Sequence, residues 1–276
     1  MTDNPILVIG ARGKTGRHVV SRLQERGVPV RAASRSTGTR FDFADRSTWG
    51  PALDGTGAVY LVPMTEYADV GAVLAFIREI GDRRVVLLSS RGLTEGAAHP
   101  IQEPYETAVR ESAAEWTILR PGWFSQNFSE DFFHPLVLAG EMALSTGEGR
   151  EAFVDTRDIA DVAVEALTGA GHSGKIYELT GPEALDFGDV AARISAETGR
   201  PLRYTPISGD AFRQALTAEG TPADLAEVLA GLLEAIRDGV GEKVTDDVRR
   251  VLGREPRTFA EYAKETAATG VWTPRG

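Results

Sequence analysis

The residues best placed to do chemistry form a glycine-punctuated turn at residues 10–16 (GARGKTG), directly after the apolar run 6–9 (ILVI). The amphipathic pattern that follows, at residues 15–26, predicts a helix. Glycines at Gly10, Gly13 and Gly16 permit a positive-φ turn and let a phosphate approach backbone N–H groups at a helix start. This pattern predicts a phosphate-binding strand–turn–helix unit, with an ordinary tight turn as the alternative.

The turn resembles two kinds of phosphate loop, and its spacing separates them. Lys14 and Thr15 imitate the end of a mononucleotide-binding P-loop, but that motif needs a glycine five residues before Gly13. The chain has Val8 there. The spacing therefore favours a dinucleotide.

The end of the next predicted strand, residues 29–34, indicates which dinucleotide binds. NAD sites usually place Asp or Glu there to hold the ribose 2′-hydroxyl, whereas this chain has Ser34 and Arg35. A hydroxyl and a guanidinium are the groups that a 2′-phosphate requires. We therefore predict an NADP(H) site; the alternative is that Arg35 only solvates the strand end.

The elements that position these residues alternate through the first two-thirds of the chain. Continuous apolar strands separated by helices are typical of a parallel sheet covered on both faces, with all strand ends along one edge. Ligands bind at that edge. We predict strands at 5–10, 29–34, 57–62, 83–89 and 115–120, and helices near 15–26, 67–80 and 103–113.

After residue 182 the pattern becomes mostly helical. We predict helices near 186–198, 208–219, 222–238, 244–253 and 258–267, with a weak strand signal at 202–204. The expected fold is α/β: a Rossmann-type doubly wound parallel sheet at 1–182, with a smaller, mostly helical substrate-side domain at 183–276.

Composition excludes several classes of function. The 276 residues contain no cysteine, which excludes disulfides and thiolate catalysis, and the four histidines lack metal-ligand spacing, so no metal site is expected. A net charge of −10 argues against a nucleic-acid partner. No 18-residue apolar run or secretory leader is visible, so we expect a cytoplasmic protein without a membrane segment.

A proton-donating pair common in carbonyl reductases on this scaffold is absent from the sequence. The pair is Tyr-x-x-x-Lys, and none of the six tyrosines has a lysine four residues later; after Tyr105 that position holds Val109. No catalytic side chain is therefore predicted. Ser89 and Ser90 end a strand, where they either contact nicotinamide or substrate or serve the fold alone.

An aromatic segment follows the fifth strand. Trp123, Phe124 and Phe128, with Asn127 between them, could wall a hydrophobic substrate beside the nicotinamide. Packing of a helix start in the core is the alternative for the aromatic rings, and capping of a turn is the alternative for Asn127.

These features together resemble the NmrA-like branch of the atypical short-chain dehydrogenase/reductase superfamily, and in particular its ergot-alkaloid reductases, the festuclavine and agroclavine synthases. The resemblance covers nearly the whole chain. It is carried by Gly13-Lys14-Thr15, Ala33-Ser34-Arg35, Phe41-Asp42-Phe43 with Thr48-Trp49, and residues 58–62, 119–128, 153–160 and 253–259.

The resemblance implies an NADPH-dependent reductase with a C-terminal substrate domain. The cofactor contacts it implies are Gly10, Gly13, Lys14, Thr15, Gly16, Ser34 and Arg35, an adenine edge at Asp42 and Phe43, and a nicotinamide half lined by Leu61, Val62, Pro63, Pro121 and Trp123. Arg12 departs from the small residue usual at its position, and it either clamps the phosphates or points into solvent.

These features are consistent with two functions, one of an enzyme and one of a non-catalytic regulator. The leading one is hydride transfer from NADPH to a hydrophobic small molecule of iminium (alkaloid-like), quinone or enone type. The alternative is a non-catalytic NADP(H)-sensing regulator, because the resembling family also contains redox sensors.

Overall fold

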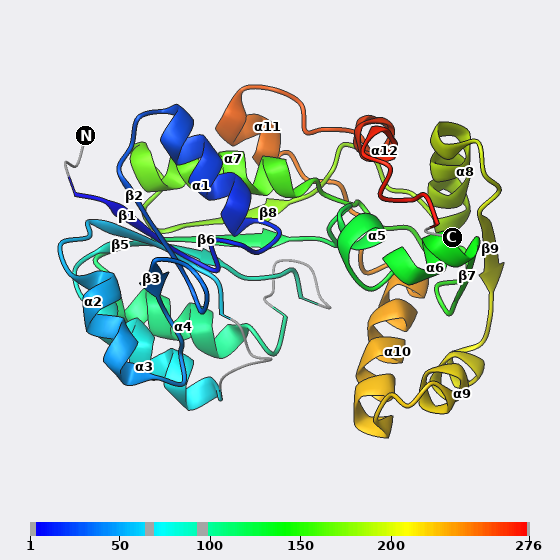
Figure 1. The fold of residues 1–276 in the computed structure, drawn as a ribbon, viewed down its shortest axis with the longest axis horizontal. Helices are drawn as coiled ribbons and strands as arrows, with labels where there is room; N and C mark the ends of the chain where they lie inside the picture. Colours follow the sequence, from blue (N-terminus) through cyan, green and yellow to red (C-terminus); the bar gives the residue numbers. More distant parts are fainter. Residues whose placement is uncertain (1–3, 64–68, 93–98, 275–276) are drawn as a thin grey trace. The chain divides into compact units, whose positions relative to one another are not determined.

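The computed structural model describes residues 4–63, 69–92 and 99–274, and the chain forms two compact units (Figure 1). The sheet unit contains residues 1–121, 156–179 and 246–255. The helical unit contains residues 122–155, 180–245 and 256–276. This division differs from the single boundary after residue 182 that the sequence predicts, because each unit is assembled from three separate segments.

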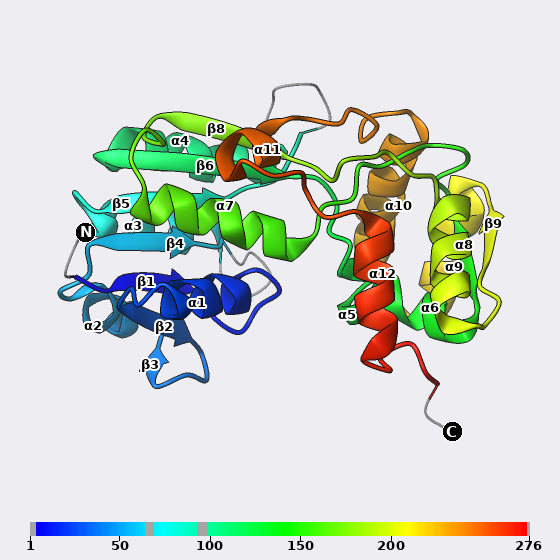
Figure 2. The same cartoon turned by 90° about the horizontal axis from the view of Figure 1, so that it is seen from above.

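A parallel sheet of seven strands, counted over the described residues, forms the centre of the sheet unit. The strand order is β3-β2-β1-β4-β5-β6-β8, and every pair of neighbours is parallel. Figure 2 shows the strands side by side in this order. Their bounds are β1 Ile6–Ile9, β2 Val30–Ser34, β3 Thr39–Arg40, β4 Ala58–Leu61, β5 Arg84–Leu88, β6 Glu115–Pro121 and β8 Lys175–Leu179.

Helices cover both faces of this sheet, which confirms the predicted doubly wound α/β fold (Figure 1). One face carries α1 (Gly16–Glu25), α7 (Thr156–Thr168) and α11 (Asp247–Leu252). The other carries α2 (Trp49–Leu53), α3 (Val70–Ile80) and α4 (Glu103–Ser112). The first two residues of the helix predicted at 67–80 lie outside the described residues.

The strands are continuously apolar because both faces of the sheet are buried. All four residues of β1 are at most 1% exposed. Leu7 and Ile9 pack in one cluster with Phe76 of α3, while the alternation of a strand turns Ile6 and Val8 to the opposite face. The apolar run at 6–9 therefore supplies both hydrophobic layers.

The strand order reverses direction beside β1. From β1 the chain moves outward through β2 and β3, then returns to place β4 on the other side of β1. Open α/β sheets bind ligands at the carboxyl ends of the strands where the order reverses. The glycine loop at residues 10–15 follows the carboxyl end of β1 and so lies at this point.

The helical unit has an aromatic core. The ring of Phe128 lies 4.7–5.9 Å, between centroids, from the rings of Phe133, Phe153, Phe187 and Phe259. The elements around it are α5 Asn127–Glu130, α6 His134–Ala139, β7 Glu141–Leu144, α8 Phe187–Thr198, β9 Arg203–Pro206, α9 Gly209–Ala218, α10 Ala223–Arg237 and α12 Phe259–Ala268.

This core explains why residues 122–155 do not belong to the sheet unit. Phe128, Phe133 and Phe153 come from that segment, and they pack on Phe187 and Phe259 from the C-terminal third of the chain. Such long-range packing leaves no local pattern in the sequence.

The predicted helix near 244–253 corresponds to α11, which belongs to the sheet unit. Asp247 at its start accepts a hydrogen bond from the backbone N–H of Glu178 in β8 (2.8 Å). Arg254, just after it, pairs with Asp158 and Asp161 of α7 at 2.7 and 2.6 Å. Among the helices of residues 4–63, 69–92 and 99–274, none combines the length and the apolar character of a membrane span.

Candidate functional site

The glycine loop has the backbone geometry of a phosphate cradle. Gly10 adopts φ +70°, and its carbonyl accepts a hydrogen bond from the N–H of Gly13 (2.8 Å). A Cβ on Gly16 would lie 2.2 Å from the Gly10 oxygen, whereas one on Gly13 would lie 3.2 Å from it. The fold therefore requires glycine at 10 and 16, and tolerates a side chain better at 13.

Thr15 turns its side chain into the protein. Its hydroxyl accepts a hydrogen bond from the Tyr60 hydroxyl of β4 at 3.0 Å, and Thr15 is only 3% exposed. Burial raises the pKa of the Tyr60 hydroxyl, which therefore stays protonated and keeps donating. Thr15 can offer a nucleotide its backbone, while its side chain fixes the start of α1 on the sheet.

The predicted 2′-phosphate loop lies beside the glycine loop. The N–H of Ala11 donates to the carbonyl of Ala33 at 3.2 Å, and Arg12 Nη1 donates to Ser36 Oγ at 2.8 Å. In the same turn, the Ser36 N–H donates to Ser34 Oγ at 3.2 Å. The structure thus brings Arg12 to the loop that carries Ser34 and Arg35.

The predicted adenine edge is divided between two environments. The Phe43 ring is 3% exposed and packs edge-on against Phe41 and Phe76, so it belongs to the core rather than to a ligand surface. Asp42 is half-buried, and its carboxylate accepts a hydrogen bond from the N–H of Ala44 at 3.0 Å. Of the two side chains, Asp42 alone is left as a candidate adenine contact.

The remaining predicted contacts of the sheet unit follow the carboxyl ends of β4, β5 and β6. Leu61, Pro63 and Pro121 are buried, and Val62 and Ser90 are half-buried. Because these strands are parallel, their ends share one edge of the sheet with the glycine loop.

Ser89 serves a buried ion pair. Its hydroxyl donates to Glu106 Oε1 at 2.6 Å, and Arg120 of β6 donates to both oxygens of the same carboxylate at 2.8 and 2.6 Å. Glu106 is 0% exposed, and its carboxylate raises the pKa of Arg120. Ser89 therefore satisfies a buried charge, which is a structural role.

Tyr105 is unsuited to donating a proton to substrate. The residue is 0% exposed, and its hydroxyl has no hydrogen-bond partner among the described residues. Burial raises the pKa of this hydroxyl, which opposes proton release.

The predicted substrate residues after β6 lie in the helical unit. Phe128 is 0% exposed in the centre of the aromatic core, so core packing accounts for it. Trp123 stacks on Phe133 with 5.5 Å between ring centroids but is only half-buried, as are Phe124 and Asn127. These three retain surface that a ligand could contact.

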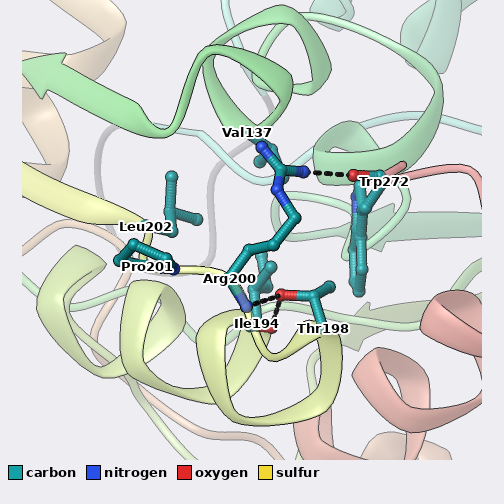
Figure 3. Close-up of a pocket in the computed structure, with 7 residues that line it drawn as sticks. All are labelled: Val137, Ile194, Thr198, Arg200, Pro201, Leu202 and Trp272. Atoms are coloured by element: carbon teal, nitrogen blue, oxygen red, sulfur yellow. Dashed lines mark hydrogen bonds between the residues drawn. The ribbon is translucent and has the colours of Figure 1, made fainter. Parts of the chain in front are cut away.

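A cavity inside the helical unit is too small for an organic substrate. Its volume is about 10 Å³, enough for one water molecule (Figure 3). Arg200 beside it donates to the carbonyl oxygens of Trp272 at 2.5 Å and Leu138 at 3.2 Å. Arg200 thus fixes the C-terminal segment to the end of α6.

Three residues contribute to the site although the sequence does not predict them: Ser36, Tyr60 and Glu106. Ser36 stands one residue beyond Arg35 in a hydroxyl-rich stretch, residues 34–39, and that composition is the only sequence signal for it. Tyr60 and Glu106 act through side chains distant in sequence, which no local pattern shows. Among the described residues, no group of three or more His, Asp or Glu is placed to hold a metal.

Comparison with known proteins places this geometry in a family. The model of a family described as NAD(P)H-binding matches residues 10–170. The chain is 38% identical to the oxidoreductase YesF of Bacillus subtilis, with 99% of both chains covered. It is 34% identical to an NAD(P)H azoreductase of Xenophilus azovorans, with 95% of this chain and 98% of the relative covered.

Two further similarities bear on the predicted family and fold. Agroclavine dehydrogenase of Claviceps fusiformis is 30% identical, with 98% of this chain and 99% of the relative covered. The crystal structure of an NADPH-dependent quinone oxidoreductase from Escherichia coli superposes with a TM-score of 0.79 at 24% identity, covering 94% of this chain and 99% of that one. The chain therefore belongs to the NAD(P)H-binding family, its full-length similarity to agroclavine dehydrogenase confirms the predicted resemblance to the ergot-alkaloid reductases, and it is an NAD(P)H-dependent oxidoreductase.

Proposed function

We propose that this protein is an NADPH-dependent reductase that transfers hydride to a hydrophobic small molecule of iminium, quinone or enone type. The choice of NADPH is supported mainly by the hydrogen bond from the N–H of Ala11 to the carbonyl of Ala33. It holds the glycine loop beside a strand end that carries Ser34 and Arg35 where an NAD site carries a carboxylate.

The chain's own residues account for holding the nucleotide. The start of α1, at Gly16, offers backbone N–H groups to a pyrophosphate, and the absence of a side chain on Gly13 keeps the approach open. Ser34 and Arg35 supply a hydroxyl and a guanidinium for the 2′-phosphate. When bound, the reduced nicotinamide supplies a hydride to the acceptor.

The lack of a proton donor in the tyrosine–lysine position supports the choice of acceptor. A ketone that accepts hydride becomes an alkoxide, which needs a proton as it forms. An iminium carbon that accepts hydride becomes a neutral amine and needs none. A quinone becomes a hydroquinone anion and an enone becomes an enolate. Both are delocalised oxyanions, which are less basic at oxygen than an alkoxide and take their proton from water. The names of the azoreductase and agroclavine dehydrogenase relatives agree with acceptors other than simple ketones.

The proposal is tested by following NADPH oxidation at 340 nm against four matched panels of hydrophobic acceptors: cyclic iminium ions, quinones, enones and simple ketones. We expect turnover in at least one of the first three panels. Turnover of ketones in preference to the other three would contradict the assignment, as would binding of NADPH without oxidation in any panel.

A further inference from the structure

We propose that Arg12 is a second arginine of the 2′-phosphate site, so that the glycine loop itself selects NADPH over NADH. This inference rests on the proposed preference for NADPH, and it assigns to the 2′-phosphate an arginine whose position in the sequence suggests only the pyrophosphate or solvent.

The first observation is the direction of the Arg12 side chain. Arg12 belongs to the loop between β1 and α1, yet its Nη1 reaches the hydroxyl of Ser36, 24 residues later, at 2.8 Å. The backbone holds the two loops together, because β1 pairs with β2 in parallel register and the N–H of Ala11, just beyond β1, donates to the carbonyl of Ala33 in β2. Arg12 therefore points across the loops, away from the start of α1.

The second observation is the set of groups that Arg12 joins. The Ser34 hydroxyl accepts a hydrogen bond from the backbone N–H of Ser36. A hydroxyl that accepts one hydrogen bond can still donate its own proton to another group. The bond to Ser36 uses one of the five N–H groups of the Arg12 guanidinium. The Arg12 guanidinium and the Ser34 hydroxyl thus meet at one turn, and Arg35 belongs to the same turn.

The charge of the turn fits a phosphate monoester. Residues 34–41 contain two arginines and no carboxylate, and the second of these, Arg40, pairs with Asp45 at 3.3 Å. A phosphate monoester carries about −1.5 to −2 charges at neutral pH on three acceptor oxygens. One arginine leaves part of that charge uncompensated, whereas two provide charge-assisted bonds to separate oxygens.

The same geometry opposes a pyrophosphate clamp. A pyrophosphate is held by the backbone N–H groups at the helix start, around Gly13 to Gly16. The Ser36 hydroxyl instead anchors the Arg12 side chain at the end of β2, where the ribose 2′-position is read. The two roles predict different nucleotide selectivity, so they can be separated by measurement.

The test is calorimetric titration of the wild-type protein, Arg12→Ala and Arg12→Lys with NADPH, NADH and adenosine 2′,5′-bisphosphate. For Arg12→Ala we expect affinity for NADPH and the bisphosphate to fall about ten- to a hundredfold, and affinity for NADH to stay within about twofold. Arg12→Lys keeps the charge but loses the planar fork, so its loss should be intermediate.

A matched control is Arg26→Ala, which removes an arginine from the other end of α1, where Arg26 pairs with Glu165. It should leave all three affinities within about twofold. Equal losses for NADPH and NADH in Arg12→Ala would overturn the inference in favour of a pyrophosphate clamp, and no loss for either would overturn it in favour of a solvent-exposed arginine. A wild-type protein that binds NADH as tightly as NADPH would instead overturn the proposed nucleotide preference itself.

Discussion

Two glycines of the phosphate loop, Gly13 and Gly16, lack a side chain for different reasons. A side-chain carbon on Gly16 would meet the carbonyl of Gly10 at 2.2 Å, which is closer than any real contact, whereas the same carbon on Gly13 would stay 3.2 Å away. Gly16 therefore lets α1 pack onto the end of β1. Gly13 keeps open the space that a pyrophosphate needs.

This difference predicts two separable defects. Gly16→Ala should lower the free energy of unfolding by about 1–3 kcal/mol, because backbone must move to accommodate the methyl group. Gly13→Ala should cost under about 1 kcal/mol of stability but weaken NADPH binding at least about tenfold by obstructing the phosphate. Urea denaturation and nucleotide titration of both variants measure this; a Gly13→Ala protein with undiminished NADPH affinity would show that the loop is only a turn.

Tyr105 lies on the helix that follows the Ser89–Ser90 strand end, where the tyrosine of a Tyr-x-x-x-Lys pair would stand. Its burial argues against a role in proton transfer. Tyr105→Phe removes a buried hydroxyl that has no partner among the described residues, so stability should stay the same or rise by about 1 kcal/mol. Turnover should stay within a few-fold of wild type, because loss of a general acid costs about 10²–10⁴-fold. Steady-state NADPH oxidation measures the turnover of the variant. A loss of turnover larger than a hundredfold would identify Tyr105 as the proton donor.

Sequence patterns locate the candidate residues along the chain but do not give the directions of their side chains. They place Thr15, Ser89 and Phe128 at strand ends and turns, where ligands bind, and the family resemblance adds Phe43 at the adenine edge. In the structure these four side chains are at most 5% exposed and make their contacts in the protein interior. A pattern identifies the residue that follows a strand, whereas the rotamer depends on neighbours such as Tyr60 and Glu106 that are far away in sequence.

At the scale of elements, the sheet is predicted best where it is most deeply buried. The first strand, β1, is entirely apolar because both of its faces are covered. The edge strand β8, with the sequence KIYEL, mixes polar and apolar residues and gives no such signal. Four of the five residues of β8 are exposed or half-buried, so this strand has no hydrophobic run by which the sequence could predict it.

Arg254 is one of the residues that anchor residues 246–255 to the sheet unit. Arg254 bonds to Asp158 and Asp161 of α7, and Asp161 also bonds to Arg22 of α1. Arg254→Ala should lower the free energy of unfolding by about 1–3 kcal/mol, because Asp158 is 0% exposed and loses a charged partner. Urea denaturation measures the change. Arg249→Ala is the control: this arginine is 51% exposed in a surface pair with Asp246, and its loss should cost under about 0.5 kcal/mol. Equal effects of the two substitutions would contradict the anchoring role.

In the whole molecule, the chain crosses repeatedly between its two units. Local sequence patterns do not predict these crossings. The change to a helical pattern after residue 182 is real, since α8, α9, α10 and α12 all lie in the helical unit. The aromatic segment 122–155 and the sheet-bound segment 246–255 are assigned by contacts between distant residues. Local periodicity carries no information about such contacts.

The ratio of kcat/KM for NADPH and NADH, measured with one acceptor from the iminium, quinone or enone panel, reports directly whether the sheet unit holds NADPH for hydride transfer. A charge-assisted phosphate contact contributes about 1.5–3 kcal/mol, so kcat/KM should be at least about tenfold higher with NADPH. Equal values, or a higher value with NADH, would show that the protein does not recognise the 2′-phosphate.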